Sequence, residues 1–329
     1  MLKDMGGSGI RWLEIAVTAP AEAAEAIAEV LSRYVPHGVA FDYGPVPADE
    51  ADWERPPLPR DTLTVLAYLP MTPGWEDARQ RIEEGLWHLR QILPFPPPRF
   101  RMLEEEEWSE AWKAHYDVLR VGPFVIQPTW RRAELRPGEL LIELDPGMAF
   151  GTGTHPTTRL CLQALAEWLR PGDRVLDLGT GSGILAIAAA RRGAGWVWAL
   201  DIDAVAVRVA KENVRRNGVS DRVEVTQGSL SEALARGERF DGILANILAP
   251  VIRRFCEQGW STLLRPGGWV IVSGFLCGEQ EESVREALAA AGLTVCGRWV
   301  DADWVALGAR LVERPQIAYT REEDSLQGK

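Results

Sequence analysis

The sequence predicts an α/β protein in which a smaller α+β domain precedes a larger, mostly parallel sheet with helices on both faces. Three observations lead to this expectation. From residue 173 onward, strand-like and helix-like segments alternate, which is typical of parallel sheets covered on both sides. A glycine-rich turn at 179–183 separates the first of these strands from its helix. Residues 11–104 instead follow the order β-α-β-β-α-β.

The N-terminal segment contains runs with the alternating pattern of strands and runs with the spacing of amphipathic helices. Strands are expected at 11–17, 38–43, 62–69 and 99–104, and helices at 20–33 and 75–93. Pro20 is suited to the first turn of its helix. The order β-α-β-β-α-β is that of a ferredoxin-like sandwich. We therefore expect residues 1–104 to form a ferredoxin-like α+β domain.

An acidic stretch then leads into the larger domain. Residues 105–120 are expected to form a linker helix, 121–314 the second domain, and 315–329 a polar tail. Within the second domain, strands are expected at 123–129, 139–144, 173–178, 196–201, 222–226, 240–245 and 267–273. Helices are expected at 183–192, 204–217, 230–236, 248–263 and 279–291. The runs 293–300 and 303–311 read as a hairpin, so the last strand should be antiparallel.

The negative charge of the chain is concentrated at its N-terminal end. The net charge is −11, and residues 1–110 carry 10 Lys and Arg against 20 Asp and Glu. This charge favours either solubility alone or a surface that attracts a basic partner. Direct nucleic-acid binding predicts the opposite sign.

Composition also indicates the compartment and the absence of a metal. No apolar run of about 18 residues predicts a membrane span, and the N-terminus lacks a signal-peptide pattern. The four cysteines, at 161, 256, 277 and 296, are scattered and are expected to be buried apolar residues. The four histidines show no metal-ligand spacing. We expect a cytoplasmic, metal-free protein.

The glycine turn predicts the ligand class by its spacing. Its glycines stand at 179, 181 and 183, and Ile184 occupies the position where a dinucleotide fingerprint has its third glycine. No phosphate-binding G-x-x-x-x-G-K-[ST] is present. A strand, tight glycine turn and helix without phosphate machinery indicate a nucleoside ligand without a pyrophosphate, and S-adenosylmethionine fits. A purely structural turn remains the alternative.

Two strand ends supply polar candidates beside this turn. Asp201 ends the second strand of the parallel sheet and is expected to bind both ribose hydroxyls. Asp203 is expected to cap the following helix. Asn246 follows another strand and can offer its amide to a methyl acceptor or to the cofactor, with helix capping as the alternative. Methyl transfer needs a positioned, unprotonated nucleophile rather than a strong base.

The segment Leu144-Asp-Pro-Gly-Met-Ala-Phe-Gly-Thr-Gly-Thr-His-Pro-Thr-Thr158 is the most specific motif. It reads as a Gly/Thr/Pro loop, 145–156, that can fold over the crevice as a lid before an apolar helix. Together with Asp177-Leu-Gly-Thr-Gly-Ser-Gly-Ile-Leu185, Asp201-Ile-Asp203 and Ala245-Asn-Ile-Leu248, it closely resembles the ribosomal protein L-eleven methyltransferases.

The resemblance implies a Rossmann-like class I methyltransferase sheet behind a ferredoxin-like domain that recognises the ribosomal protein. It implies S-adenosylmethionine as cofactor and amino groups, both lysine side chains and an N-terminal amine, as acceptors. It assigns the cofactor contacts to Thr158 in the loop, Gly179, Asp201 and Asn246, with Gly181 and Phe150 as neighbours and Asn246 as the catalytic residue. Thr180 stands where the family commonly has Cys.

The partner implied is the eleventh protein of the large ribosomal subunit, free or on the ribosome, with no direct nucleic-acid or membrane contact. Three alternatives stay open. One is methylation of lysines on another protein, such as an electron-transfer flavoprotein subunit. Another is methylation of RNA or DNA amino groups, against which Ile247 and Leu248 argue, because such enzymes usually have Pro after the strand-end Asn or Asp. The last is a non-catalytic cofactor-binding assembly factor.

Overall fold

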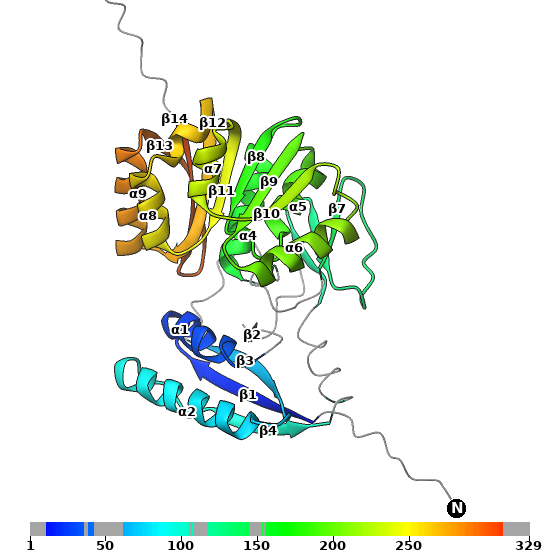
Figure 1. Cartoon of the computed structure of the whole chain (residues 1–329), viewed down its shortest axis with the longest axis vertical. Helices are drawn as coiled ribbons and strands as arrows, with labels where there is room; N and C mark the ends of the chain where they lie inside the picture. The colour runs from blue at the N-terminus through cyan, green and yellow to red at the C-terminus, as the bar shows by residue number, and fades with distance from the viewer. Residues whose placement is uncertain are drawn as a thin grey trace, which may run out of the picture.

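The computed structural model describes residues 11–35, 39–42, 62–104, 107, 117–144, 153 and 155–311 (Figure 1). Its first sheet is built from β1 (Trp12–Ala19), β2 (Val39–Asp42), β3 (Leu63–Pro70) and β4 (Arg99–Leu103), with α1 (Ala21–Ser32) and α2 (Trp75–Ile92). The strand order is β2-β3-β1-β4 and every pairing is antiparallel. The predicted ferredoxin-like topology is therefore confirmed. Pro20 stands at the N-cap of α1 rather than within its first turn.

Both helices pack on one face of this sheet, because alternate side chains of β1 point towards them. Leu13, Ile15 and Val17 lie in one buried cluster with Ile27 of α1 and Ile82 of α2. On the opposite face, Ala16, Ala40 and Leu66 form a small buried cluster against which Trp130 packs. Trp130 belongs to the segment that follows β6, so this contact joins the first sheet to the larger part of the chain.

A small second sheet follows, of order β5-β6-β7. Its strands are β5 (Leu119–Val121), β6 (Phe124–Gln127) and β7 (Leu140–Glu143); β5 and β6 are antiparallel, and β6 and β7 are parallel. The linker-helix prediction is wrong at its C-terminal end, because Leu119 and Arg120 belong to β5. Its residues 105–106 and 108–116 lie outside the described part of the chain.

The largest sheet has seven strands in the order β10-β9-β8-β11-β12-β14-β13. They are β8 (Arg174–Leu178), β9 (Trp196–Asp201), β10 (Val223–Gln227), β11 (Phe240–Asn246), β12 (Leu264–Leu276), β13 (Leu293–Asp301) and β14 (Trp304–Leu311). The first five in this order are parallel, and β14 is antiparallel to both neighbours. The predicted antiparallel last strand is confirmed. The sheet order reverses at β8, so the crevice for a ligand lies at the carboxyl ends of β8, β9 and β11.

Helices cover both faces of this sheet. One buried cluster joins it to α4 (Pro156–Trp168), α5 (Ile184–Arg192) and α6 (Ala204–Arg216). The other joins it to α7 (Leu230–Arg236), α8 (Ala249–Glu257), the short 3-10 helix η2 (Trp260–Leu263) and α9 (Glu279–Ala290). Neighbouring strands of the sheet also fit closely, because a Cβ on Gly242 of β11 would lie 2.2 Å from the ring of Trp269 on β12. The sheet is therefore a packed middle layer, as the strand–helix alternation predicts.

Two elements differ most from the sequence prediction. The helix expected at 248–263 ends at Glu257, since Gly259 turns the chain with a φ of 82° before η2. Strand β12 begins earlier than expected, at Leu264, and runs through Pro266 and two glycines. Its pairing with β11 is irregular there, with a register shift between Phe240 and Gly242.

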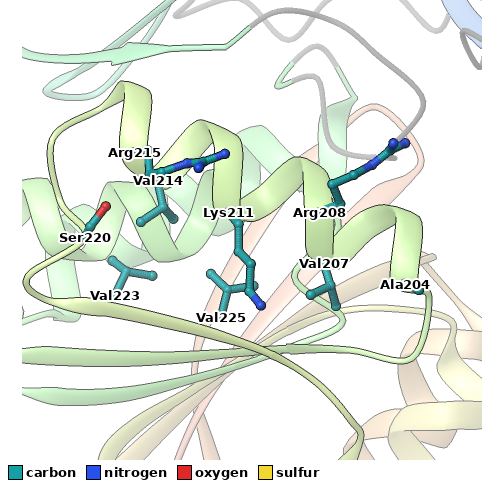
Figure 2. A pocket seen from close by; sticks show the side chains of 9 residues that line it. All are labelled: Ala204, Val207, Arg208, Lys211, Val214, Arg215, Ser220, Val223 and Val225. Carbon is teal, nitrogen blue, oxygen red and sulfur yellow. The ribbon is translucent and has the colours of Figure 1, made fainter.

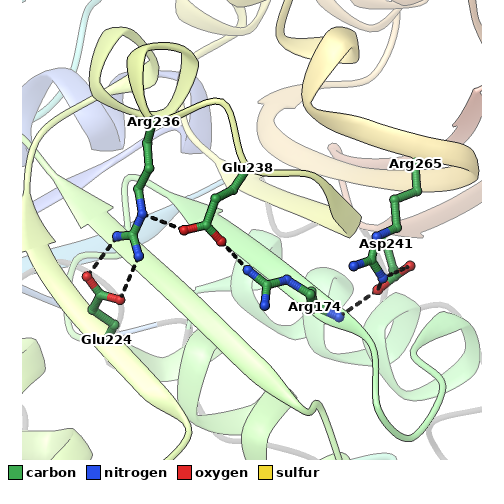
Figure 3. Close-up of polar contacts among 6 residues, drawn as sticks. All are labelled: Arg174, Glu224, Arg236, Glu238, Asp241 and Arg265. Atoms are coloured by element: carbon green, nitrogen blue, oxygen red, sulfur yellow. Dashed lines mark hydrogen bonds and ion pairs between the residues drawn. The ribbon is translucent and has the colours of Figure 1, made fainter.

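Charged side chains join the strands at their amino-terminal ends, opposite the end that carries the crevice (Figure 3). Arg236 donates to Glu224 at 2.9 Å and to Glu238 at 2.6 Å, and Arg174 pairs with Glu238. The guanidinium of Arg174 also lies 4.3 Å from the ring centroid of Trp196. These groups are a quarter to two fifths exposed, so each pair contributes modestly to stability. Among the described helices, none is long and apolar enough to span a membrane.

Candidate functional site

The glycine turn lies directly after β8 and is tied to the end of β9. The amide N–H groups of Gly179 and Thr180 both donate to the carbonyl of Leu200 at 2.9 Å. Gly179 has a φ of 76°, and a Cβ there would lie 2.6 Å from Cγ2 of Ile247. Glycine is therefore required at this position both for the backbone conformation and for the space next to β11.

Asp201 ends β9 with its carboxylate held by two backbone donors. Its Oδ2 accepts from the N–H of Gly181 at 2.9 Å, and its Oδ1 accepts from that of Asp203 at 3.0 Å. The side chain is half-buried, and each carboxylate oxygen can accept a further hydrogen bond. Gly181 thus fixes Asp201 at the mouth of the crevice. The predicted capping role of Asp203 is confirmed, because its Oδ1 accepts from the N–H of Val205 at 2.9 Å in the first turn of α6.

Asn246 lies at the end of β11, across the same crevice. Leu244, two residues earlier, is paired with Asp177 of β8, which places Asn246 level with the glycine turn. Its Nδ2 donates to Oγ1 of Thr158 at 3.3 Å. Its Oδ1 is buried and accepts no hydrogen bond within the described part of the chain. Leu248, not Asn246, stands at the N-cap of α8, so the capping alternative is wrong.

Thr158 reaches this site from α4, which corrects its predicted place in the loop. It is the third residue of the helix and fully buried. The helix is capped by His155, whose Nδ1 accepts from the N–H of Thr157 at 3.3 Å and contacts its hydroxyl at 2.7 Å. Burial, with the nearby Arg159 guanidinium, lowers the pKa of His155 to about 3. Phe150 and most of the 145–156 loop lie outside the described residues.

A buried carboxyl group lies beneath the glycine turn and was not singled out from the sequence. Asp177 is 1% exposed, and its Oδ2 accepts from the Thr180 hydroxyl at 2.7 Å. Burial raises the pKa of Asp177 to about 7, although the Thr180 hydrogen bond lowers it. The charge of Asp201 adds to the rise. The sequence did contain a signal for this residue, because Asp177 is an acidic residue two positions before the first glycine of the turn.

This buried carboxyl predicts a pH-dependent stability. The folded chain keeps a proton on Asp177 that the unfolded chain releases near its ordinary pKa of 3.8. Stability should therefore fall as pH rises from about 4 to 7. Relative to Asp177→Asn, the unaltered protein should lose roughly 2–3 kcal/mol of unfolding free energy between pH 5 and pH 8. Urea denaturation of both proteins at these two pH values measures the difference, and parallel pH profiles would contradict it.

A separate groove of about 530 Å³ lies between α6 and the edge strand β10. Figure 2 shows Val223 and Val225 below α6, with the Lys211 side chain extending down towards Val225 and that of Arg208 pointing away. None of the strand-end residues of the crevice lines it. This groove is therefore distinct from the nucleoside site.

Cysteine burial agrees with the prediction only in part. Cys161 and Cys256 are buried, and burial raises the pKa of both thiols, that of Cys256 to about 11. Cys277 is half-buried and Cys296 exposed, so the prediction is wrong for these two. All four are free thiols. Within the described ranges, no three His, Cys, Asp or Glu side chains are grouped to hold a metal ion.

Comparisons with known proteins agree with this arrangement. Residues 11–311 match the family model described as ribosomal protein L11 methyltransferase (PrmA). A protein of that name from Chloroflexus aurantiacus is 45% identical over 93% of this chain and 98% of its own length. One from Geobacillus kaustophilus is 42% identical over 91% and 99%. A crystal structure of ribosomal protein L11 methylase from Lactobacillus delbrueckii subsp. bulgaricus is 32% identical, has a TM-score of 0.54, and covers 60% of this chain and all of its own.

Proposed function

Because this chain belongs to the ribosomal protein L11 methyltransferase family, we propose that it methylates lysine side-chain and N-terminal amino groups of ribosomal protein L11. The chain is a methyltransferase that uses S-adenosylmethionine. The observation that carries the proposal is the juxtaposition of Asn246, Asp201 and the glycine turn at one crevice. We expect the enzyme in the cytoplasm, because ribosomal proteins are made there.

The residues of the crevice fit this cofactor. A Cβ on Gly179 would clash with Ile247, so glycine lets the turn pack against the end of β11 beside the crevice. The half-buried carboxylate of Asp201, oriented by Gly181, is placed to accept hydrogen bonds from ribose hydroxyls. The buried Oδ1 of Asn246 needs a donor, because an unsatisfied buried polar atom is costly. An amine supplies that donor.

When bound, S-adenosylmethionine supplies a methyl group on a positively charged sulfur. Asp201, the glycine turn and Asn246 would hold the cofactor, which would supply its methyl group to the lone pair of the acceptor amine, with the carbon–sulfur bonding pair kept by sulfur and the amine proton released to solvent. Asn246 orients the amine through Oδ1 while Thr158 fixes the amide through Nδ2. His155 is buried with a pKa of about 3, so it does not serve as a base at neutral pH. Removal of water lowers the pKa of the amine and favours its neutral form.

The acidic N-terminal domain gives the enzyme a recognition surface. Ribosomal proteins are basic, and opposite charges speed encounter between partners. We expect the association rate with L11 to fall as salt is raised from low to physiological concentration. Stopped-flow measurement of binding at several salt concentrations checks this. A rate that does not change with salt would rule out steering while leaving the chemistry intact.

The direct test is transfer of labelled methyl groups to purified L11, with mass spectrometry to locate the modified amines. Label on lysine and N-terminal amines is the expected result. Cofactor binding without transfer would indicate an assembly factor instead, and transfer only to another protein would change the substrate. Free L11 and intact unmethylated ribosomes used side by side distinguish the two forms of the substrate.

Asp201→Ala tests the ribose assignment within the same assay. The variant should lose the hydrogen bonds from the carboxylate to the two ribose hydroxyls of the cofactor. This loss should weaken cofactor binding by roughly 10- to 100-fold. Calorimetric titration with S-adenosylmethionine measures the change. Asp203→Ala is the control: it removes the α6 cap and lowers stability by about 1 kcal/mol, with cofactor affinity nearly unchanged. Equal affinities in the two variants would contradict the assignment.

A further inference from the structure

A second groove, of about 400 Å³, adjoins the crevice at the N-terminal ends of α8 and α9; we name it the α8–α9 groove. It is lined by Leu248 and Arg253 at α8, by Leu276 and Glu279 at the junction of β12 and α9, by Trp304 of β14, and by Glu22 of α1. Five of these residues belong to the seven-stranded part of the chain and Glu22 to the first domain. Figure 1 shows α1 beneath α8 and α9.

The groove lies on the segments that directly follow the strand end carrying Asn246. Leu248 follows Asn246 by two residues, and Ile247 between them donates its N–H to the carbonyl of Ser273 at 3.0 Å. Gly274, which also lines the groove, approaches so closely that a Cβ would lie 2.5 Å from the Ile247 carbonyl oxygen. A chain in the groove would therefore contact the segment that directly follows Asn246.

The apolar side of the groove is unusual for a free surface. Leu248 is 57% exposed at the N-cap of α8, a position where a short polar side chain is normally favoured. Trp304, which is largely buried, also lines the groove and contacts His155 edge-on, with ring centroids 4.7 Å apart. His155 caps the helix that carries Thr158. Apolar surface at this point favours the aliphatic part of a bound polypeptide and helps to exclude water from the amine.

The charged rim selects for a cation. Glu22 and Glu279 are exposed and take part in no ion pair among the residues described. Arg253 is the single cationic side chain in the lining as described. Two carboxylates against one guanidinium attract a basic segment and draw in an ammonium group before it loses its proton. Because Glu22 belongs to α1, the groove is lined by residues of both the first sheet's helix layer and the seven-stranded part of the chain.

We propose that the α8–α9 groove binds the polypeptide segment of the substrate next to the amine that is methylated. The occupant is a basic segment whose aliphatic side chains lie on Leu248 and Trp304 and whose positive charge faces Glu22 and Glu279. This inference rests on the proposed function and adds to it a surface that sets substrate affinity. It makes Leu248 and Glu22 specificity residues that touch neither cofactor nor the reacting atoms.

Steady-state methylation of full-length L11 by the full chain tests the groove. Leu248→Asp and Glu22→Lys should each raise the KM for L11 roughly 5-fold or more, as expected when an interface contact is lost. The kcat at saturating L11 and the affinity for S-adenosylmethionine should stay within about 2-fold, because neither residue belongs to the crevice. Leu135→Asp and Glu29→Lys are matched controls, since Leu135 is an exposed leucine outside the groove and Glu29 lies on α1 two turns beyond Glu22.

The controls separate this inference from its alternatives. If Glu29→Lys raised KM as much as Glu22→Lys, the overall charge of the first domain would explain the effect and the groove would not. If both groove variants matched their controls, the groove inference would be overturned while the proposed function stood. If the unaltered enzyme transferred no methyl group to L11, the proposed function would fail first and the inference with it.

A cross-link identifies the occupant directly. A photoreactive benzoylphenylalanine placed at position 248 should cross-link to L11 within a few residues of a methylated amine, as mapped by mass spectrometry. The same group at position 135 should give no such product. Cross-links from position 248 only to a second copy of the enzyme would overturn the proposal and mark the groove as a contact between enzyme molecules.

Discussion

Replacing Asn246 by alanine should lower the kcat for L11 methylation by roughly 100-fold or more, the scale seen when one preorganised polar contact is removed from an active site. The buried Oδ1 has no partner in the described structure, so it is free to accept from the amine. The Nδ2 is already used, since it donates to Thr158 at 3.3 Å. Single-turnover kinetics measure the chemical step, and cofactor affinity should fall by less than about 10-fold, because Asp201 and the glycine turn remain.

Thr158→Val separates the orienting contact from the acceptor contact. This change keeps the shape of the side chain and removes the oxygen that holds the Asn246 amide. A smaller loss, about 10-fold in kcat, is expected, because the amide keeps Oδ1 but is less firmly oriented. The pair of variants should not be additive, since both act on one hydrogen-bonded unit.

Asn217→Ala is the matched control for Asn246. Asn217 is also buried, but its amide donates to the carbonyls of Glu143 and Asn213 at 2.8 and 2.9 Å, so it joins β7 to α6. Its loss should reduce stability by about 1–3 kcal/mol and leave kcat nearly unchanged. If Asn246→Ala kept the kcat of the unaltered enzyme, or if Asn217→Ala lost as much, the catalytic role of Asn246 would have to be withdrawn.

The strands and helices around the crevice were predictable because local signals there agree with the tertiary structure. The bounds of β9 and α7 match the prediction, and β8 and α5 differ from it by one residue at one end. Glycines with positive φ at 179, 181 and 183 explain the agreement at β8 and α5, because few other residues adopt that backbone and the pattern is visible in the sequence. Asp203 was predictable for the same reason, since capping involves only its own helix.

Other features depend on contacts between distant segments. Thr158 reaches Asn246 across 88 residues of sequence, and no local pattern indicates that a helix start would meet a strand end. The pKa of Asp177 follows from burial, which becomes evident only when the layers are assembled. Strand β5 is three residues long, too short for a periodic signal against the acidic segment before it. Strand β12 has no register partners from Arg265 to Gly268, between its pairs with Phe240 and Gly242 of β11, so Pro266 lies in an irregular stretch that the local sequence does not identify as strand.

Gly179→Ala should abolish measurable cofactor binding, a loss of roughly 100-fold or more in affinity. A Cβ at this position would lie 2.6 Å from Cγ2 of Ile247, and the φ of 76° is strained for alanine. Relief of the clash would push the turn away from β11 and so separate Asp201 from Asn246. Calorimetric titration with S-adenosylmethionine and thermal unfolding of the same samples measure binding and stability together.

Gly267→Ala distinguishes the clash from the backbone strain. Its φ of 71° is close to that of Gly179, but a Cβ there would have no atom within 4 Å. Both substitutions force alanine into a left-handed conformation, which costs on the order of 1 kcal/mol. Only Gly179→Ala moves the crevice, so only this variant should lose cofactor affinity. Equal cofactor affinity in the two variants would mean that the Ile247 side chain moves aside for the new methyl group. The packing of the glycine turn against Ile247 would then not be what sets the distance between Asp201 and Asn246.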